Sequence, residues 1–263
     1  MAVSEGHAEQ ARRVLSLLDL TELGDEARDD DVRSLCSRAT SDYGQVAAVC
    51  VWPRFVELAV AALAGSGVRV ATVTNFPSGA LLLGDVLAQT ASALDDGADE
   101  IDVVLPYRAV VAGDLTTAEV LLDSVRRAVP RDGSHLLKVI LETGELGDSA
   151  TVDVAARLAI RCGADFIKTS TGKTPRSASL EATAVMLAAI KDLDPRVGLK
   201  ASGGIRTLDD ARSYLAQADE TMGPDWVSPR TFRFGASGLL AALVAEIESG
   251  DDDSIGDETR EGY

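Results

Sequence analysis

Buried amines are the groups in this chain best suited to chemistry. Only five of the 25 basic residues are lysines, and they occupy positions 138, 168, 173, 191 and 200. Lys138, Lys168 and Lys200 lie in or at the end of apolar stretches typical of buried strands. An ammonium that is disfavoured by burial or by a neighbouring cation loses its proton more readily and becomes a nucleophile toward aldehydes. Several lysines in one core therefore predict imine chemistry on a carbonyl substrate.

A short internal repeat connects one of these lysines to an acid. The tripeptide Gly-Ala-Asp occurs at 97–99 and again at 163–165, 66 residues later, which is the length of two strand-helix units. Asp102 and Lys168 each lie five residues after their repeat glycine. On the fourth and sixth strands of a barrel, they are expected to project into the same interior layer.

A buried acid and a buried lysine can also exist only to neutralise each other. Desolvation makes such a pair costly compared with apolar packing, so a functional role is favoured. Asp102 is expected to transfer protons, and Lys200 to keep it ionised. The residues alone do not decide which of Lys138, Lys168 and Lys200 forms the imine.

Three glycine-rich turns after the last strands predict a phosphate site. They are Thr171-Gly172-Lys173-Thr174, Ser202-Gly203-Gly204 and Gly235-Ala236-Ser237-Gly238. Small residues at such turns expose backbone N–H groups, and the N-terminus of the following helix favours an anion. Each turn alone can equally be a tight connection, but three in succession favour phosphate. A nucleotide-binding Walker A motif is excluded because Ile167 stands where that motif needs its first glycine.

Alternating strand-like and helix-like stretches must position these groups. Eight β-branched stretches are predicted as strands, at 17–20, 46–52, 69–74, 100–105, 136–142, 165–169, 197–201 and 232–235. Eight amphipathic stretches are predicted as helices, at 30–40, 54–65, 80–96, 115–129, 148–162, 179–192, 207–217 and 237–248. This order specifies an α/β protein with a (β/α)8 TIM barrel. A doubly wound open sheet is the alternative, but no Gly-x-Gly-x-x-Gly follows the first strand.

The barrel is expected to be a single domain over residues 1–248, with an additional helix at its N-terminal end. Residues 249–263 contain six acids and one arginine with almost no apolar side chains. Such a composition predicts a flexible acidic tail, which ends in Tyr263.

Composition excludes several functional classes. The 263 residues carry a formal charge of −17, so nucleic acid and anionic membranes would repel the chain. Three cysteines and two histidines without metal-ligand spacing predict no metal, no other cofactor and no disulfide framework. Neither a signal peptide nor a membrane span is recognised, which predicts a cytoplasmic protein. The excess of acids and the scarcity of lysine suggest function at high salt, and an ordinary cytoplasm is the alternative.

The motifs around these residues resemble the deoxyribose-phosphate aldolase family. The likeness covers about residues 10–248. Its most specific motif is FIKTSTGK at 166–173. Further motifs are DLT at 19–21, CVWPRF at 50–55, EIDVV at 100–104, GLKASGGIRT at 198–207 and FRFGAS at 232–237. The resemblance implies a metal-independent class I aldolase, a lyase that reversibly cleaves 2-deoxy-D-ribose 5-phosphate into D-glyceraldehyde 3-phosphate and acetaldehyde. It also implies a homodimer.

The resemblance assigns roles to individual residues. It implies that Lys168 forms the imine, that Lys200 depresses the pKa of Lys168, and that Asp102 transfers protons. The substrate-binding residues that it implies are Asp19, Thr21, Cys50 and Thr171. The phosphate-binding residues that it implies are Gly172, Lys173, Gly203, Gly204, Gly235 and Ser237. A C-terminal tyrosine shuttles protons in some members, which makes Tyr263 a candidate for this role.

The chain departs from the family pattern at two turns. Ala201-Ser202 follows Lys200 where members often have Pro-Ala, and Gly238 replaces the second of two serines after the last strand. Loss of that hydroxyl is expected to weaken phosphate binding modestly. Two alternatives remain, another class I phosphosugar aldolase and a catalytically silent phosphosugar-binding regulator. A metal-dependent isomerase is disfavoured, because His135 alone does not supply a ligand set.

Overall fold

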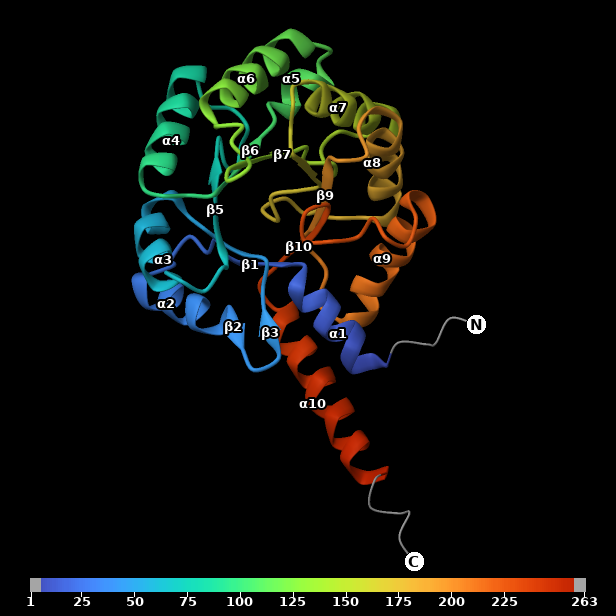
Figure 1. Cartoon of the computed structure of the whole chain (residues 1–263). Coiled ribbons are helices and arrows are strands. Elements are labelled where there is room, and N and C mark those ends of the chain that lie inside the picture. Colours follow the sequence, from blue (N-terminus) through green and yellow to red (C-terminus); the bar gives the residue numbers. More distant parts are fainter. Residues whose placement is uncertain (1–5, 258–263) are drawn as a thin grey trace, which may run out of the picture.

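The computed structural model describes residues 6–257 and contains a closed barrel of eight parallel strands, seen along its axis in Figure 1. The barrel strands are β1 (Leu18–Glu22), β4 (Ala48–Val51), β5 (Arg69–Thr74), β6 (Glu100–Val104), β7 (Leu136–Ile140), β8 (Phe166–Lys168), β9 (Gly198–Ser202) and β10 (Phe232–Ala236). Pairing of β1 with both β4 and β10 closes the sheet. All eight strands lie within two residues of the stretches predicted from the sequence, and the (β/α)8 barrel is confirmed.

Helices surround the barrel, as Figure 1 shows. The eight helices that follow barrel strands were predicted from the sequence and include α2 (Asp29–Arg38), α3 (Val56–Ala62), α4 (Leu83–Asp95), α6 (Leu115–Ala128), α7 (Ser149–Arg161), α8 (Leu180–Leu193), α9 (Leu208–Met222) and α10 (Leu239–Asp257). The predicted N-terminal helix is α1 (His7–Ser16). A short helix η1 (Pro53–Phe55), the helix α5 (Tyr107–Val111) and the two-residue strands β2 (Thr40–Ser41) and β3 (Gly44–Gln45) were not predicted.

Side-chain caps determine where several of these helices begin. Asp148 accepts a hydrogen bond from the third residue of α7, and Ser179 does the same for α8. Thr207 and Asp210 form a reciprocal capping box at the start of α9. These caps satisfy backbone N–H groups that would otherwise lack partners, so they fix the ends of the turns that lead from the strands.

Strand alternation separates an apolar outer core from a charged interior. In β1, Leu18 and Leu20 are fully buried in the apolar cluster that includes residues of the surrounding helices. Asp19 lies between them on the other face of the strand and is also fully buried. Fixed charge therefore occupies the interior of the barrel, whereas the apolar residues that hold the helices in place lie outside it.

The strand register explains how the two repeat residues meet. Asp102 of β6 pairs with Lys138 of β7, while Lys168 of β8 pairs with Ile140, two residues further along β7. In a barrel of eight strands with a shear number of eight, residues of one interior layer are offset in register by about one residue per strand, and therefore by two residues over two strands. The prediction that Asp102 and Lys168 project into the same layer agrees with this register.

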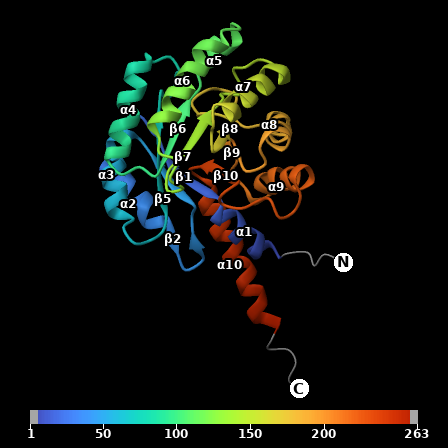
Figure 2. The same ribbon diagram turned by 45° about the horizontal axis from the view of Figure 1, so that its top comes forward.

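Helix α10 continues to Asp257, past residue 249, where the acidic tail was predicted to begin, and the division into a barrel domain and a tail stays a prediction. The helix runs beside α1 and extends beyond the end of the barrel, as Figures 1 and 2 show. At Gly250 the two helices are so close that an added Cβ would lie 2.8 Å from Cβ of Ala8. This contact with α1 stabilises helical backbone at Gly250, although the acidic composition of the segment from residue 249 onward did not predict a helix. Among the residues that the structure describes, no helix is long and apolar enough to cross a membrane.

Candidate active site

A network of buried ions fills the barrel interior. It contains the carboxylates of Asp19, Glu100 and Asp102, each of them fully buried. Its basic groups are Lys138, Lys168, Lys200 and Arg233, which are at most 3% exposed. Because burying an isolated charge is costly, each group must be held by partners of opposite sign.

Asp102 is the centre of this network. Its Oδ2 atom accepts hydrogen bonds from Nζ of Lys168 and from Nζ of Lys200, each at 2.9 Å. Its Oδ1 atom accepts a hydrogen bond from Nζ of Lys138 at 2.7 Å. Lys200 also contacts Oδ2 of Asp19 at 2.6 Å. One carboxylate therefore contacts all three lysines that were candidates for imine formation.

The environment distinguishes these three lysines by their pKa values. Burial lowers the pKa of Lys168 below its ordinary value, and the cation of Lys200 lowers it further against the opposing effect of Asp102. Burial acts in the same direction on Lys138 and Lys200, but their acidic neighbours outweigh it and raise both pKa values. Lys168 is therefore the amine of the three that loses its proton most readily.

The acids are held in their ionised forms. Burial alone would raise the pKa of Asp102, but the three surrounding lysines lower it well below its ordinary value. The pKa of Asp19 is likewise lowered, because Lys200 and Arg233 outweigh the effect of burial. Asp102 is thus ionised at rest and can accept a proton beside the amine of Lys168.

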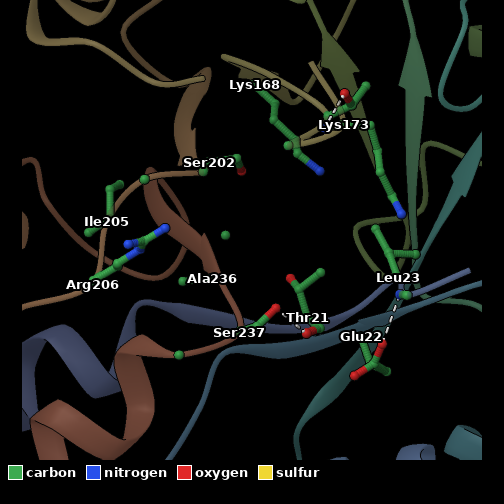
Figure 3. A pocket seen from close by; sticks show the side chains of 17 residues that line it. Thr21, Glu22, Leu23, Lys168, Lys173, Ser202, Ile205, Arg206, Ala236 and Ser237 are labelled. Atoms are coloured by element: carbon green, nitrogen blue, oxygen red, sulfur yellow. Dashed lines mark hydrogen bonds between the residues drawn. The ribbon is translucent and has the colours of Figure 1, made fainter. Parts of the chain in front are cut away.

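A cavity of about 430 Å³ opens above Lys168 at the carboxyl-terminal ends of the strands. It is lined by residues from the turns after β1, β8, β9 and β10. Figure 3 shows the amine of Lys168 directed into this cavity, with the hydroxyl groups of Thr21 and Ser237 on another side. Nine of the residues predicted for the site line it, namely Thr21, Lys168, Thr171, Gly172, Lys173, Gly203, Gly204, Gly235 and Ser237.

Glycines shape the part of the cavity that was predicted to hold phosphate. Gly203 and Gly204 have φ angles of 85° and 84°, in the left-handed region that favours glycine. Successive backbone N–H groups in such turns can converge on an anion. Gly235 has a different function, because a Cβ there would overlap Oγ of Ser202 and would lie 3.0 Å from Cε of Lys200.

Two predicted phosphate ligands have protein partners. Ser237 donates its hydroxyl to the carbonyl of Thr21 at 2.8 Å, which ties the turn after β10 to β1. Nζ of Lys173 contacts Oδ1 of Asp25 at 2.8 Å and lies 5.8 Å from the ring centre of Trp52. Lys173 therefore reaches across the cavity mouth toward the turn after β1.

Cys50 lies below the cavity and does not line it. Its side chain is fully buried in an apolar cluster with Leu23, Ala71 and Val73. Burial raises the pKa of its thiol, so it remains protonated at neutral pH. That Cys50 lies beside the bound aldehyde remains a prediction. The role of Tyr263 also remains a prediction, because this residue lies outside the described residues.

Three residues that line or support the cavity were not among the site residues predicted from the sequence, although Ser202 belongs to one of the predicted turns. Arg206 lines it, and Figure 3 shows its guanidinium directed into the open space. Ser202 also lines it, and its buried hydroxyl has no hydrogen-bond partner within the described part of the chain. Glu142 is fully buried and accepts a hydrogen bond from Oγ1 of Thr171 at 2.5 Å. An arginine two residues after the glycine pair of a predicted phosphate turn was the available signal for Arg206.

Comparison with known proteins relates this geometry to one family. A family model described as "DeoC/LacD family aldolase" matches residues 13–244. A curated deoxyribose-phosphate aldolase of Agrobacterium fabrum is 49% identical over 244 residues, which covers 92% of this chain and 93% of that protein.

Solved structures give the same result. The crystal structure of an inferred deoxyribose-phosphate aldolase from Toxoplasma gondii superimposes with a TM-score of 0.85 at 27% identity, covering 94% of this chain and 97% of that one. An inferred deoxyribose-phosphate aldolase from Coccidioides immitis has a TM-score of 0.79 at 31% identity, covering 89% of this chain and 86% of that one.

Proposed function

Because this chain belongs to the DeoC/LacD family of aldolases, we propose that it is a deoxyribose-phosphate aldolase whose imine forms on Lys168. The observation that carries the proposal is the position of Lys168, the one lysine of the buried network whose pKa is lowered, at the floor of a glycine-lined cavity. The substrate is 2-deoxy-D-ribose 5-phosphate in its open-chain form. The products are D-glyceraldehyde 3-phosphate and acetaldehyde.

The first stage of the proposed reaction is imine formation. The neutral amine of Lys168 attacks the C1 aldehyde carbon and forms a carbinolamine. Its hydroxyl group takes up a proton and leaves as water, which produces a protonated imine. Asp102 and Lys200 are suited to exchange this proton, because Oδ2 of Asp102 lies 2.9 Å from both amines.

The second stage cleaves the carbon–carbon bond. The C3 hydroxyl gives its proton to a general base, the role proposed for Asp102. The C2–C3 bond then breaks, and its electron pair moves into the protonated imine to give an enamine. The phosphate-bearing fragment leaves as glyceraldehyde 3-phosphate. Protonation of the enamine at C2 and addition of water then release acetaldehyde and restore the free amine of Lys168.

The turns after the last strands account for the phosphate. In the proposed complex, backbone N–H groups around Gly172 and Gly204 hold the phosphate oxygens. The N–H of Gly203 donates to the carbonyl of Gly235 at 3.3 Å in the structure and must change partner to join them. Arg206 supplies a positive charge at the same side of the cavity. The phosphate end of the substrate then lies at the turns, whereas the aldehyde end reaches the strands.

The decisive experiment is reductive trapping. Incubation with acetaldehyde and cyanoborohydride should add one ethyl group per chain, and peptide mapping should place this group on Lys168. A modification on Lys138 or Lys200 would contradict the assignment. Absence of any adduct would favour the silent phosphosugar-binding regulator, and cleavage of a different phosphosugar would favour another class I aldolase.

Removing the cation of Lys200 should change how the reaction depends on pH. Lys200→Met removes a positive charge that lowers the pKa of Lys168, so that pKa rises and a smaller fraction of the amine is neutral at pH 7. We expect kcat/KM at pH 7 to fall by about 10²-fold, and its acid limb to move upward by about one pH unit. Exposed Lys191 offers the control, since Lys191→Met removes the same charge outside the barrel. An unshifted acid limb in Lys200→Met would exclude this role.

Removal of the Arg206 guanidinium should weaken binding of the phosphate end. We expect Arg206→Gln to raise KM for the phosphorylated sugar by about tenfold, because a charge-assisted contact with phosphate is worth about 1.5–3 kcal/mol. Cleavage of unphosphorylated 2-deoxyribose should stay unchanged. Arg33→Gln, on the exposed face of α2, is the matched control. Equal losses with both sugars would mean that Arg206 does not bind phosphate.

Three further properties are part of the proposal. A cytoplasmic location was predicted from the sequence, whereas assembly as a homodimer and proton exchange at the methyl carbon of acetaldehyde assisted by Tyr263 are implied by the family resemblance. Deletion of Tyr263 with unchanged methyl-proton exchange would remove the last of these.

A further inference from the structure

Glu100 is a fully buried carboxylate that the proposed reaction does not use. It is the first residue of β6 and lies two positions before Asp102, on the same face of the strand. Three cations from three other strands face it. Nε of Arg69 lies 2.8 Å from its Oε1 atom, Nη2 of Arg233 lies 3.3 Å from the same atom, and Nζ of Lys138 contacts Oε2.

Lys138 bridges the two acids of β6. Besides Glu100, its amine contacts Oδ1 of Asp102 at 2.7 Å and Oδ2 of Asp19 at 3.6 Å. By occupying Oδ1, Lys138 leaves the other oxygen of Asp102 to Lys168 and Lys200. The orientation of the Asp102 carboxylate is therefore set from the side opposite the cavity.

We propose that Glu100 and Lys138 form a positioning pair that orients Asp102 and balances the charge around Lys168. Glu100 holds the ammonium of Lys138, and Lys138 in turn holds Asp102. Neither group touches the substrate. The inference depends on the proposed function, because Lys168 must be the imine-forming amine.

The count of buried charges supports this balance. Asp19, Glu100 and Asp102 carry three negative charges in the interior. Three positive charges come from Lys138, Lys200 and Arg233, and the partly exposed Arg69 lies at the edge of the network. The three negative charges are therefore balanced even when Lys168 carries no proton. The amine of Lys168 can be neutral, and each carboxylate still has a positively charged partner.

Each member of the pair should act on Lys168 with opposite sign. The charged and polarisable groups that face Lys168 are Asp102 on β6, Lys200 on β9 and Cys50 on β4. Removal of the negative charge of Glu100 makes this environment more positive and disfavours the ammonium form of Lys168. Removal of the positive charge of Lys138 makes it more negative and favours that form.

The test measures the pH at which trapping of acetaldehyde on Lys168 by cyanoborohydride is half-maximal, by intact-protein and peptide mass. We expect this pH to fall by about one unit in Glu100→Gln and to rise by about one unit in Lys138→Met. The double variant, Glu100→Gln with Lys138→Met, removes one charge of each sign and should return to within a few tenths of a unit of the wild type.

Further variants separate charge from position. Glu100→Asp keeps the charge but shortens the side chain, so it should lower kcat severalfold while the half-maximal pH stays near that of the wild type. Asp153→Asn is the matched control, since Asp153 pairs with Arg157 at 2.9 Å on α7 and does not belong to the network. It should change neither quantity.

Three outcomes would overturn the inference. The first is a shift of the half-maximal pH with the same sign in Glu100→Gln and Lys138→Met. The second is an unchanged half-maximal pH in both variants. The third is a double variant whose half-maximal pH differs from that of the wild type as much as those of the single variants do. If Glu100→Gln fails to fold, Lys138→Met alone still tests the sign. Failure of the proposed function is distinct, because then the wild-type chain itself would not be trapped on Lys168.

Discussion

Replacement of Lys168 by methionine should abolish aldol cleavage. The methionine side chain is of similar length and has no amine, so no imine can form and the electrons of the breaking bond have no acceptor. We expect kcat/KM for 2-deoxy-D-ribose 5-phosphate to fall by about 10⁴-fold or more. A coupled assay for glyceraldehyde 3-phosphate would measure this loss, and cyanoborohydride would no longer add an ethyl group.

The same variant should fold normally. Asp102 keeps Lys138 and Lys200 as partners, and an apolar group replaces an amine whose protonation is already disfavoured by burial. We therefore expect the free energy of unfolding to be unchanged or to increase by about 1 kcal/mol. A substantial drop in melting temperature would show that Lys168 is mainly a structural ion. Retained cleavage in a folded Lys168→Met protein would refute the proposed function.

Replacement of Asp102 by asparagine should separate imine formation from turnover. Asparagine keeps the size of the side chain but cannot exchange protons, so we expect kcat to fall by about 10³-fold. Asp102 raises the pKa of Lys168, and its loss should lower that pKa further and leave more of the amine neutral. Trapping of acetaldehyde on Lys168 should therefore persist although turnover is nearly lost.

Stability requires a separate measurement for this variant. Asp102 contacts three lysines, and the loss of its charge leaves Lys138 with Glu100 and Asp19, and Lys200 with Asp19 alone. We expect the free energy of unfolding to fall by about 3 kcal/mol, measured by denaturant titration. The trapping yield should then be compared at a temperature where the variant is folded. If the folded variant turns over at the wild-type rate, Asp102 does not transfer protons.

Much of the barrel could be predicted because its strands are strongly patterned. The eight β-branched stretches and the helices between them were recognisable from periodicity. The repeat of Gly-Ala-Asp even indicated that Asp102 and Lys168 share a layer, since equal spacing after a repeat implies equal height on parallel strands. Composition alone did not predict the last turns of α10, which continue to Asp257 although their residues are mostly acidic.

The choice among the lysines could not be predicted from spacing. Lys138, Lys168 and Lys200 all follow apolar residues in strands, and only the position of each amine relative to Asp19, Glu100 and Asp102 separates their pKa values. Glu100 and Arg233 were missed for a similar reason. A charged residue at or near the start of a strand suggests a solvated turn. In the closed barrel, however, the side chains of Glu100 and Arg233 point into the interior.

The residues proposed for bond cleavage project from strands, whereas those proposed for phosphate recognition lie on the turns after β8, β9 and β10. Turns tolerate substitution better than a packed barrel interior does. Directed evolution of this enzyme toward unphosphorylated or bulkier acceptors can therefore concentrate on a few turn positions, Arg206 and Ser237 foremost. Libraries that vary only these positions should yield enzymes with altered acceptor preference that still carry out aldol cleavage.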